Sequence, residues 1–324
     1  MFNVRTDLAL ESREIYKQRN NRDADGVVVE EEEINGVKIN KVKITNELGS
    51  GKLGKPIGTY ITLDIPEFTA YDGELMDNVS NVFGKILKQL VNVKKDDKVL
   101  VIGLGNWNVT PDALGPKVVD GIMITRHLSE VMPDIMEEGM VSVAAIAPGV
   151  LGITGIETLE VIKSLVERIE PTVVICIDAL AARRIERVNR TIQISNTGIA
   201  PGAGVGNHRK AINKAELGVD VIAIGVPTVV DASTIANDAI DMVLDNLIHE
   251  AEEGKEFYNM LKNIDRSGKE ALIREVLTPY VGDLIVTPKE VDLIITSLSK
   301  IISNGINIAV QPNMTVEDIN KFMN

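Results

Sequence analysis

The chain has 324 residues, of which 44% are hydrophobic, 25% are charged and 3% are aromatic, and its formal net charge is −13. This acidity argues against direct binding of nucleic acid and against docking on an anionic membrane, because both depend on Lys and Arg. Cys176 is the only cysteine, so no intrachain disulfide forms, and the lack of a signal core or of a run of about 18 apolar residues predicts a cytoplasmic protein without a membrane segment.

The first part of the chain predicts a β-hairpin, a further strand and a helix. Residues 37–44 alternate between apolar and polar side chains, which is typical of a half-buried strand. Asn35-Gly36 separates this strand from an apolar and acidic run that begins at Val27, and Asn-Gly is a strong signal for a two-residue hairpin turn. After it we expect a flexible loop over residues 49–56, a strand over 60–65 and a helix over 72–91.

From about residue 97 strands and helices are predicted to alternate. The expected strands are residues 99–103, 141–147, 172–177, 191–195 and 219–226, and the expected helices end near residue 128 or cover residues 156–169, 235–252 and 288–303. This alternation predicts an α/β fold with a mostly parallel sheet flanked by helices. Residues 255–280 break the rhythm and are expected to be an insertion. The chain thus divides into an N-terminal segment, residues 8–95, and an α/β core, residues 96–324, within one compact domain.

Two predicted loops carry aspartates at the carboxyl ends of strands, where open parallel sheets bind ligands. The first contains Gly103, Gly105, Asn106 and Asp112. The third glycine of a dinucleotide-binding fingerprint is missing, so this loop is better interpreted as a turn whose backbone amides approach a substrate carbonyl. Taken alone, Asp112 also fits a helix N-cap.

Asp178 follows the apolar residues 173–177 and is expected to open the second loop. It could form an ion pair with Arg183 or Arg184, or lie beside a second carboxyl group. Two adjacent carboxyl groups share a proton, because both cannot ionise without a large cost, and together they can act as base and acid. Asp112 and Asp178 lie at the ends of different strands, so their convergence is physically reasonable.

A third glycine-rich stretch, residues 196–208, includes Gly202, Gly204, Asn207 and His208. Its composition fits a loop that positions substrate or covers the site, and also an irregular connection. The histidines do not have the spacing of a zinc motif, although Asp112, Asp178 and His208 could together bind a metal. We expect no metal and no other cofactor.

Four segments of the chain resemble the spore germination protease family. They are residues 4–11, residues 103–106 with 111–116, residues 176–183, and residues 196–198 with 201–207. The resemblance follows the same order along nearly the whole chain. It implies an endopeptidase of the spore core that degrades small acid-soluble proteins during germination, forms a homotetramer, and has a fold similar to that of the hydrogenase-maturation endopeptidases, which are phosphorylase/hydrolase-like.

The resemblance also implies roles for particular residues. Asp112 and Asp178 correspond to the proposed catalytic aspartates, and self-cleavage would fall between Asp7 and Leu8, which makes residues 1–7 the propeptide of a zymogen. A flexible N-terminus that carries its own cleavage sequence can reach an active site without unfolding. The expected substrate-binding residues are Gly103, Gly105, Asn106, Arg183, Arg184, Gly202, Gly204, Asn207 and His208. A metal-assisted hydrolase and a non-catalytic protein that binds a peptide or nucleotide remain as alternatives.

Overall fold

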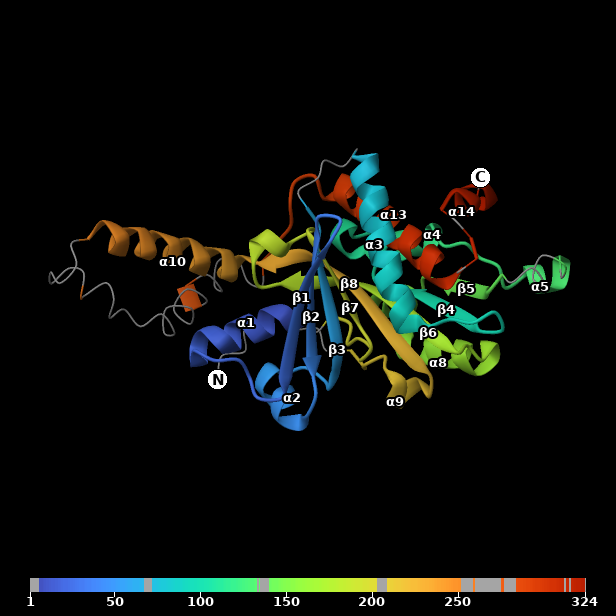
Figure 1. The fold of residues 1–324 in the computed structure, drawn as a ribbon, viewed down its shortest axis with the longest axis horizontal. Helices are drawn as coiled ribbons and strands as arrows, with labels where there is room; N and C mark the ends of the chain where they lie inside the picture. The colour runs from blue at the N-terminus through green and yellow to red at the C-terminus, as the bar shows by residue number, and fades with distance from the viewer. Residues whose placement is uncertain are drawn as a thin grey trace.

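The computed structural model (Figure 1) describes residues 6–66, 72–132, 134, 140–202, 209–251, 259, 275–276, 284–311, 313–314 and 316–323. Its strands are β1 (Val27–Ile34), β2 (Val37–Ile44), β3 (Gly58–Asp64), β4 (Lys98–Gly103), β5 (Ser142–Ile146), β6 (Val173–Ala182), β7 (Thr191–Ser195), β8 (Asp220–Asp231) and β9 (Ile285–Val286). Its helices are α1 (Ala9–Asn20), α2 (Glu47–Leu53), α3 (Gly73–Val91), α4 (Leu114–Asp120), α5 (Leu128–Val131), α7 (Leu151–Thr154), α8 (Thr158–Ile169), α9 (Lys214–Leu217), α10 (Ala232–Glu250), α13 (Val291–Val310) and α14 (Val316–Met323).

The strands form one nine-stranded sheet in the order β1-β2-β3-β7-β8-β6-β4-β5, with β9 paired to β8. The α/β class with helices flanking the sheet is confirmed. Strands β5, β4, β6 and β8 run parallel, whereas β7 is antiparallel to both β3 and β8. The parallel part of the sheet is therefore smaller than the alternation of strands and helices suggested. Residues 183–190, which connect β6 to β7, are too few to contain the crossover that would make β7 parallel to β6.

Helices cover both faces of the parallel strands (Figure 1). On one face α3, α4 and α13 pack on apolar side chains that include Val101, Ile175 and Ile177. On the other face α8 packs on side chains that include Val174 and Cys176. Successive residues of β6 thus point into different cores, as the geometry of a strand requires, and this two-sided burial explains why the parallel strands are apolar almost throughout.

The predicted hairpin is confirmed in strands β1 and β2. Asn35 and Gly36 both have positive φ, +51° and +79°, as the turn between such strands requires. The predicted loop at residues 49–56 is wrong, because α2 occupies most of it. The Asn46 side chain accepts a hydrogen bond from Gly49 N at the start of this helix, and Gly54, with φ +64°, ends it. The capping residues were therefore present in the sequence.

Two long helices, α13 and α10, concern the expected absence of a membrane segment and the expected insertion after residue 254. Helix α13 is long and apolar enough to span a membrane by composition, but 67% of that stretch is buried inside the protein, as expected for a core helix. Helix α10 projects away from the sheet (Figure 1). Of the predicted insertion at 255–280, only residues 259, 275 and 276 lie among the described residues.

Candidate active site

The first site residue, Asp112, is positioned by the loop that follows β4. Gly105 has φ +113°, and a Cβ atom on it would lie 2.0 Å from the backbone oxygen of Asp112. That oxygen accepts a hydrogen bond from Asn106 N at 3.1 Å. A side chain at Gly105 would push this backbone apart, so the glycine permits the turn that brings Asp112 back to the end of β4.

Helix α4 then packs closely against the ends of β4 and β6. A Cβ atom on Gly115 would lie 2.2 Å from Leu104 O and 2.7 Å from Ile177 O. Leu104 N also donates a hydrogen bond to Ile177 O at 2.8 Å. Because Asp178 directly follows Ile177, this close approach fixes the loop that carries Asp112 relative to the strand that carries Asp178.

Asp178 lies within β6, which continues to Ala182, and not at the start of a loop. Its side chain is 5% exposed, and its Oδ1 accepts a hydrogen bond from Ala179 N at 2.9 Å. Burial raises the pKa of Asp178 well above its ordinary value, and the charges of Asp112 and Asp7 raise it further. Burial also raises the pKa of the half-buried Asp112, against the opposing effect of the Asn106 amide.

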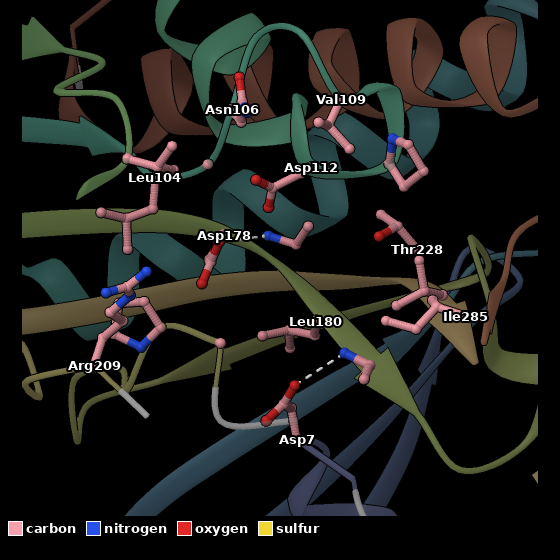
Figure 2. Close-up of a pocket in the computed structure, with 18 of the residues that line it drawn as sticks. Asp7, Leu104, Asn106, Val109, Asp112, Asp178, Leu180, Arg209, Thr228 and Ile285 are labelled. Atoms are coloured by element: carbon pink, nitrogen blue, oxygen red, sulfur yellow. Dashed lines mark hydrogen bonds between the residues drawn. The ribbon is translucent and has the colours of Figure 1, made fainter. Parts of the chain in front are cut away.

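The two carboxyl groups share a cavity of about 550 Å³. Figure 2 shows Asp112 and Asp178 at one side of it and Asp7 across from them. A buried carboxyl group that holds its proton, beside a more exposed one that can release it, is able to act as acid and base on a bound water molecule. Because the two groups interact, the pair titrates as a unit.

The sequence-predicted residues divide into three groups around this cavity. Its lining includes the predicted Gly105, Asn106, Asp112, Asp178 and Gly202. Gly103, Arg183 and Arg184 lie among the described residues but are not part of that lining, and Gly204, Asn207 and His208 lie outside the described residues.

Arg183 and Arg184 hold other parts of the chain together. The Arg183 guanidinium donates two hydrogen bonds of 2.7 Å to the Asp238 carboxylate on α10. The backbone amides of both arginines donate to the buried Glu11 carboxylate of α1, at 2.7 and 2.9 Å. Among the described residues, the cation that lines the cavity is instead Arg209, which was not predicted from the sequence although it follows the glycine-rich stretch directly.

The N-terminal segment lies against the end of β6, at the edge of the same cavity. Asp7 N donates to Ala181 O at 3.1 Å, and Ala181 N donates to Asp7 Oδ2 at 2.9 Å (Figure 2). Leu8 is fully buried. The residues on both sides of the expected self-cleavage bond are therefore held in a defined conformation, and Asp7 lines the cavity that contains the two carboxyl groups.

Two further residues, Lys55 and Gln193, hold this segment, and both were missed from the sequence. Lys55 Nζ donates to the backbone oxygens of Thr6 and Asp7, each at 3.0 Å. The only sequence signal for Gln193 was a polar side chain within an apolar strand, and nothing marked Lys55. Both contacts arise from packing between distant parts of the chain.

The described residues contain no group of three or more His, Cys, Asp or Glu side chains placed to hold a metal ion. The alternative set of Asp112, Asp178 and His208 includes one residue outside them. Loss of activity with a chelator is the measurement that would support a metal-assisted reaction.

Comparisons with known proteins identify the family of the chain. The family model described as germination protease matches residues 4–263 and 248–323. A germination protease of Clostridium perfringens is 65% identical over 100% of both chains, one of Clostridium tetani is 56% identical over the same share, and one of Bacillus mycoides is 44% identical over 95% of this chain and 94% of its own.

Among solved structures, the NiFe hydrogenase maturation protease HycI from Thermococcus kodakarensis matches 60% of this chain and 99% of its own, at 16% identity and a TM-score of 0.28. The full-length matches to curated relatives are far more specific than this structural likeness. The chain therefore belongs to the germination protease family.

Proposed function

We propose that this family member is an endopeptidase that begins the degradation of small acid-soluble spore proteins in the spore core, after cutting its own chain between Asp7 and Leu8. The observation that carries the proposal is the meeting of Asp112, Asp178 and Asp7 at one cavity. No nucleic acid, membrane or cofactor has a part in it.

In the proposed reaction Asp178 holds the proton of the singly protonated pair, because burial and the nearby carboxylates raise its pKa, and Asp112 is the ionised base. Water bound between them loses a proton to Asp112 as its oxygen adds to the substrate carbonyl carbon. Asp178 donates its proton toward the peptide nitrogen, which leaves as an amine. The pair regains its starting protonation state when the proton held by Asp112 passes to Asp178.

The acidic residue before the cut calls for local positive charge in a protein of net charge −13. Arg209 lines the cavity and Lys55 holds the Asp7 carbonyl. These two cations support the recognition of acidic cleavage sites better than Arg183, whose guanidinium is paired with Asp238.

Self-cleavage is tested by mass spectrometry of the purified protein held at mildly acidic pH. We expect the wild type to lose residues 1–7 and the Asp112→Asn variant to stay intact. The reaction should be faster at mildly acidic than at neutral pH, because the raised pKa values of Asp112 and Asp178 favour the singly protonated pair as the pH falls. Equal rates at both pH values would contradict this account of the trigger.

A homotetramer is supported by helix α10, which projects from the body (Figure 1) with Ile240, Met242 and Val243 exposed. Exposed apolar side chains that gather on one element mark contact surfaces. We expect the double substitution Met242→Glu with Val243→Glu to reduce the mass measured by light scattering to that of smaller species. Lys85→Glu, on the exposed face of α3, is the matched control and should leave the mass unchanged.

A further inference from the structure

We propose that Lys55 and Gln193 are catalytic hydrogen-bond donors, which stabilise the negative charge that develops on the Asp7 carbonyl oxygen when the bond to Leu8 is cut. This inference rests on the proposed self-cleavage at that bond. The sequence had suggested that backbone amides of a glycine-rich loop approach the substrate carbonyl. The present inference assigns the stabilisation of the carbonyl oxygen to two side chains outside these loops.

Both donors already reach the oxygen concerned. Asp7 O accepts a hydrogen bond from Lys55 Nζ at 3.0 Å and another from Gln193 Nε2 at 3.3 Å. A carbonyl oxygen that becomes an oxyanion gains most from donors that are in place beforehand, since no reorganisation is then required during the reaction. Lys55 Nζ also donates to Thr6 O, which fixes the ammonium next to the bond to be cut.

The scissile bond is also held from its other side. Gln193 Oε1 accepts a hydrogen bond from Ala9 N at 2.8 Å, so this single amide group spans the bond between Asp7 and Leu8. The Asp7 side chain accepts from Ala181 N on β6, an interaction that only a side chain with an acceptor oxygen can make. Holding reactants in this way lowers the entropic cost of reaction, and the contact with Ala181 N favours a residue with an acceptor oxygen in its side chain before the cut.

Asp7 lies between the donors and the carboxyl pair. It lines the cavity of about 550 Å³ that contains Asp112 and Asp178, and it also lines a second cavity of about 230 Å³ that contains Lys55 and Gln193. Leu180 lines both cavities and is drawn between Asp178 and Asp7 in Figure 2. Leu180 thus forms part of the boundary between the two cavities.

The surroundings of Lys55 strengthen its effect on the carbonyl oxygen. Burial lowers the pKa of its ammonium, and the nearby Asp7 and Glu11 carboxylates oppose that change. An ammonium that is partly shielded from water interacts more strongly with a developing negative charge than an exposed one does. Lys55 thus contributes charge, whereas Gln193 contributes a neutral donor.

The step balances as an ordinary hydrolysis. The oxygen of one water molecule bonds to the Asp7 carbonyl carbon, and the bond from that carbon to Leu8 N breaks. One proton of the water passes to the carboxyl pair, which supplies a proton to Leu8 N. Lys55 and Gln193 keep their own protons throughout and end beside the new carboxyl group of Asp7.

The first experiment measures the rate at which the full-length chain loses residues 1–7 at mildly acidic pH, by mass spectrometry. We expect Lys55→Met to slow this loss by about 10²–10³-fold, as removal of one oxyanion donor does. Gln193→Glu keeps an acceptor for Ala9 N but loses the donor to Asp7 O, and should slow it to a similar extent. Thermal unfolding of each variant verifies that it is folded at the assay temperature.

Chemical rescue identifies the ammonium as the active group. In Lys55→Cys the new thiol can be alkylated with 2-bromoethylamine, which restores an amine at nearly the original length, while the native Cys176 is fully buried. We expect that treatment to recover at least ten times the rate of the unmodified variant. Alkylation with iodoacetamide adds a neutral group at the same position and should recover much less.

A second readout separates charge stabilisation from simple anchoring of the N-terminus. A chain that begins at Leu8, prepared with an external protease, is assayed on a peptide with an acidic residue before the cut. Loss of a transition-state donor lowers kcat with little change in KM, whereas loss of an anchor raises KM and leaves kcat unchanged.

The outcomes separate this inference from the proposed function. Unchanged kcat and self-cleavage rate in Lys55→Met, with a wild type that cuts itself, would overturn the role of Lys55 and leave the aspartate mechanism standing. A wild type that never cuts between Asp7 and Leu8 would overturn both proposals.

Discussion

Replacing Asp178 with asparagine is expected to lower peptidase activity by about 10⁴-fold or more, as the loss of one member of a catalytic unit does, and at the same time to stabilise the fold at neutral pH. Asparagine keeps an oxygen that can accept the hydrogen bond from Ala179 N but cannot hold or release the proton. The activity should be measured on a peptide with an acidic residue before the cut. Asp120→Asn, at the exposed end of α4, is the matched control.

The gain in stability follows from the raised pKa of Asp178. Between the ordinary aspartate pKa and the raised one, the folded state binds a proton that the unfolded state has released, so the free energy of unfolding falls as the pH rises through this interval. An asparagine carries no charge to bury. The variant should therefore unfold at higher urea concentration than the wild type at neutral pH, and this difference should vanish below the ordinary aspartate pKa.

If the Asp178→Asn variant is less stable than the wild type at neutral pH, burial of the Asp178 carboxyl group does not lower the free energy of unfolding, and this explanation is wrong. Retained activity would remove Asp178 from the reaction altogether. The two measurements are independent, because one reports on the substrate and the other on folding alone.

The second large effect is expected from Gly115→Ala. The added Cβ atom would lie 2.2 Å from Leu104 O and 2.5 Å from Leu104 N, and backbone atoms cannot move aside as flexible side chains do. Overpacking of this kind costs about 3 kcal/mol, which corresponds to a fall in Tm on the order of 5–10 °C.

In this variant we expect the rate of peptide hydrolysis to fall even at temperatures at which the protein remains folded. Displacing α4 moves the loop that carries Asp112 away from the strand that carries Asp178, and a misplacement of about 1 Å can cost about 10²-fold in rate. The assay is made well below the Tm, so that the protein is folded. Gly51→Ala, where a Cβ atom would meet no atom within 4 Å, is the matched control and should leave both Tm and kcat unchanged.

The sequence predicted the elements that have local signals. Residues 37–44 alternate and Asn35-Gly36 has one preferred turn, so the hairpin could be placed from the order of the residues alone. The apolar runs of the parallel strands and the position of Asp178 at the end of such a run also carried information. In contrast, the direction of β7 depends on the length of a connection, which periodicity does not reveal.

The contacts of the site depend on residues far apart in the chain. Gln193 and Ala9 are separated by 184 positions, and Lys55 reaches the Asp7 carbonyl from the end of a helix that was itself predicted to be a loop. Arg183 illustrates the reverse case. Its charge and position suggested substrate binding, but the pairing with Asp238 could not be known without the placement of α10.

The pairing of β3 with β7 has a consequence for how the protein opens. Through this pair the N-terminal hairpin and the parallel strands share one continuous ladder of backbone hydrogen bonds, so the sequence boundary near residue 95 does not separate two sheets. Detaching the hairpin together with β3 would leave one edge of β7 without partners. We therefore expect the amide protons of β3 and of β4 to exchange with solvent through a common opening event, with equal dependence on denaturant.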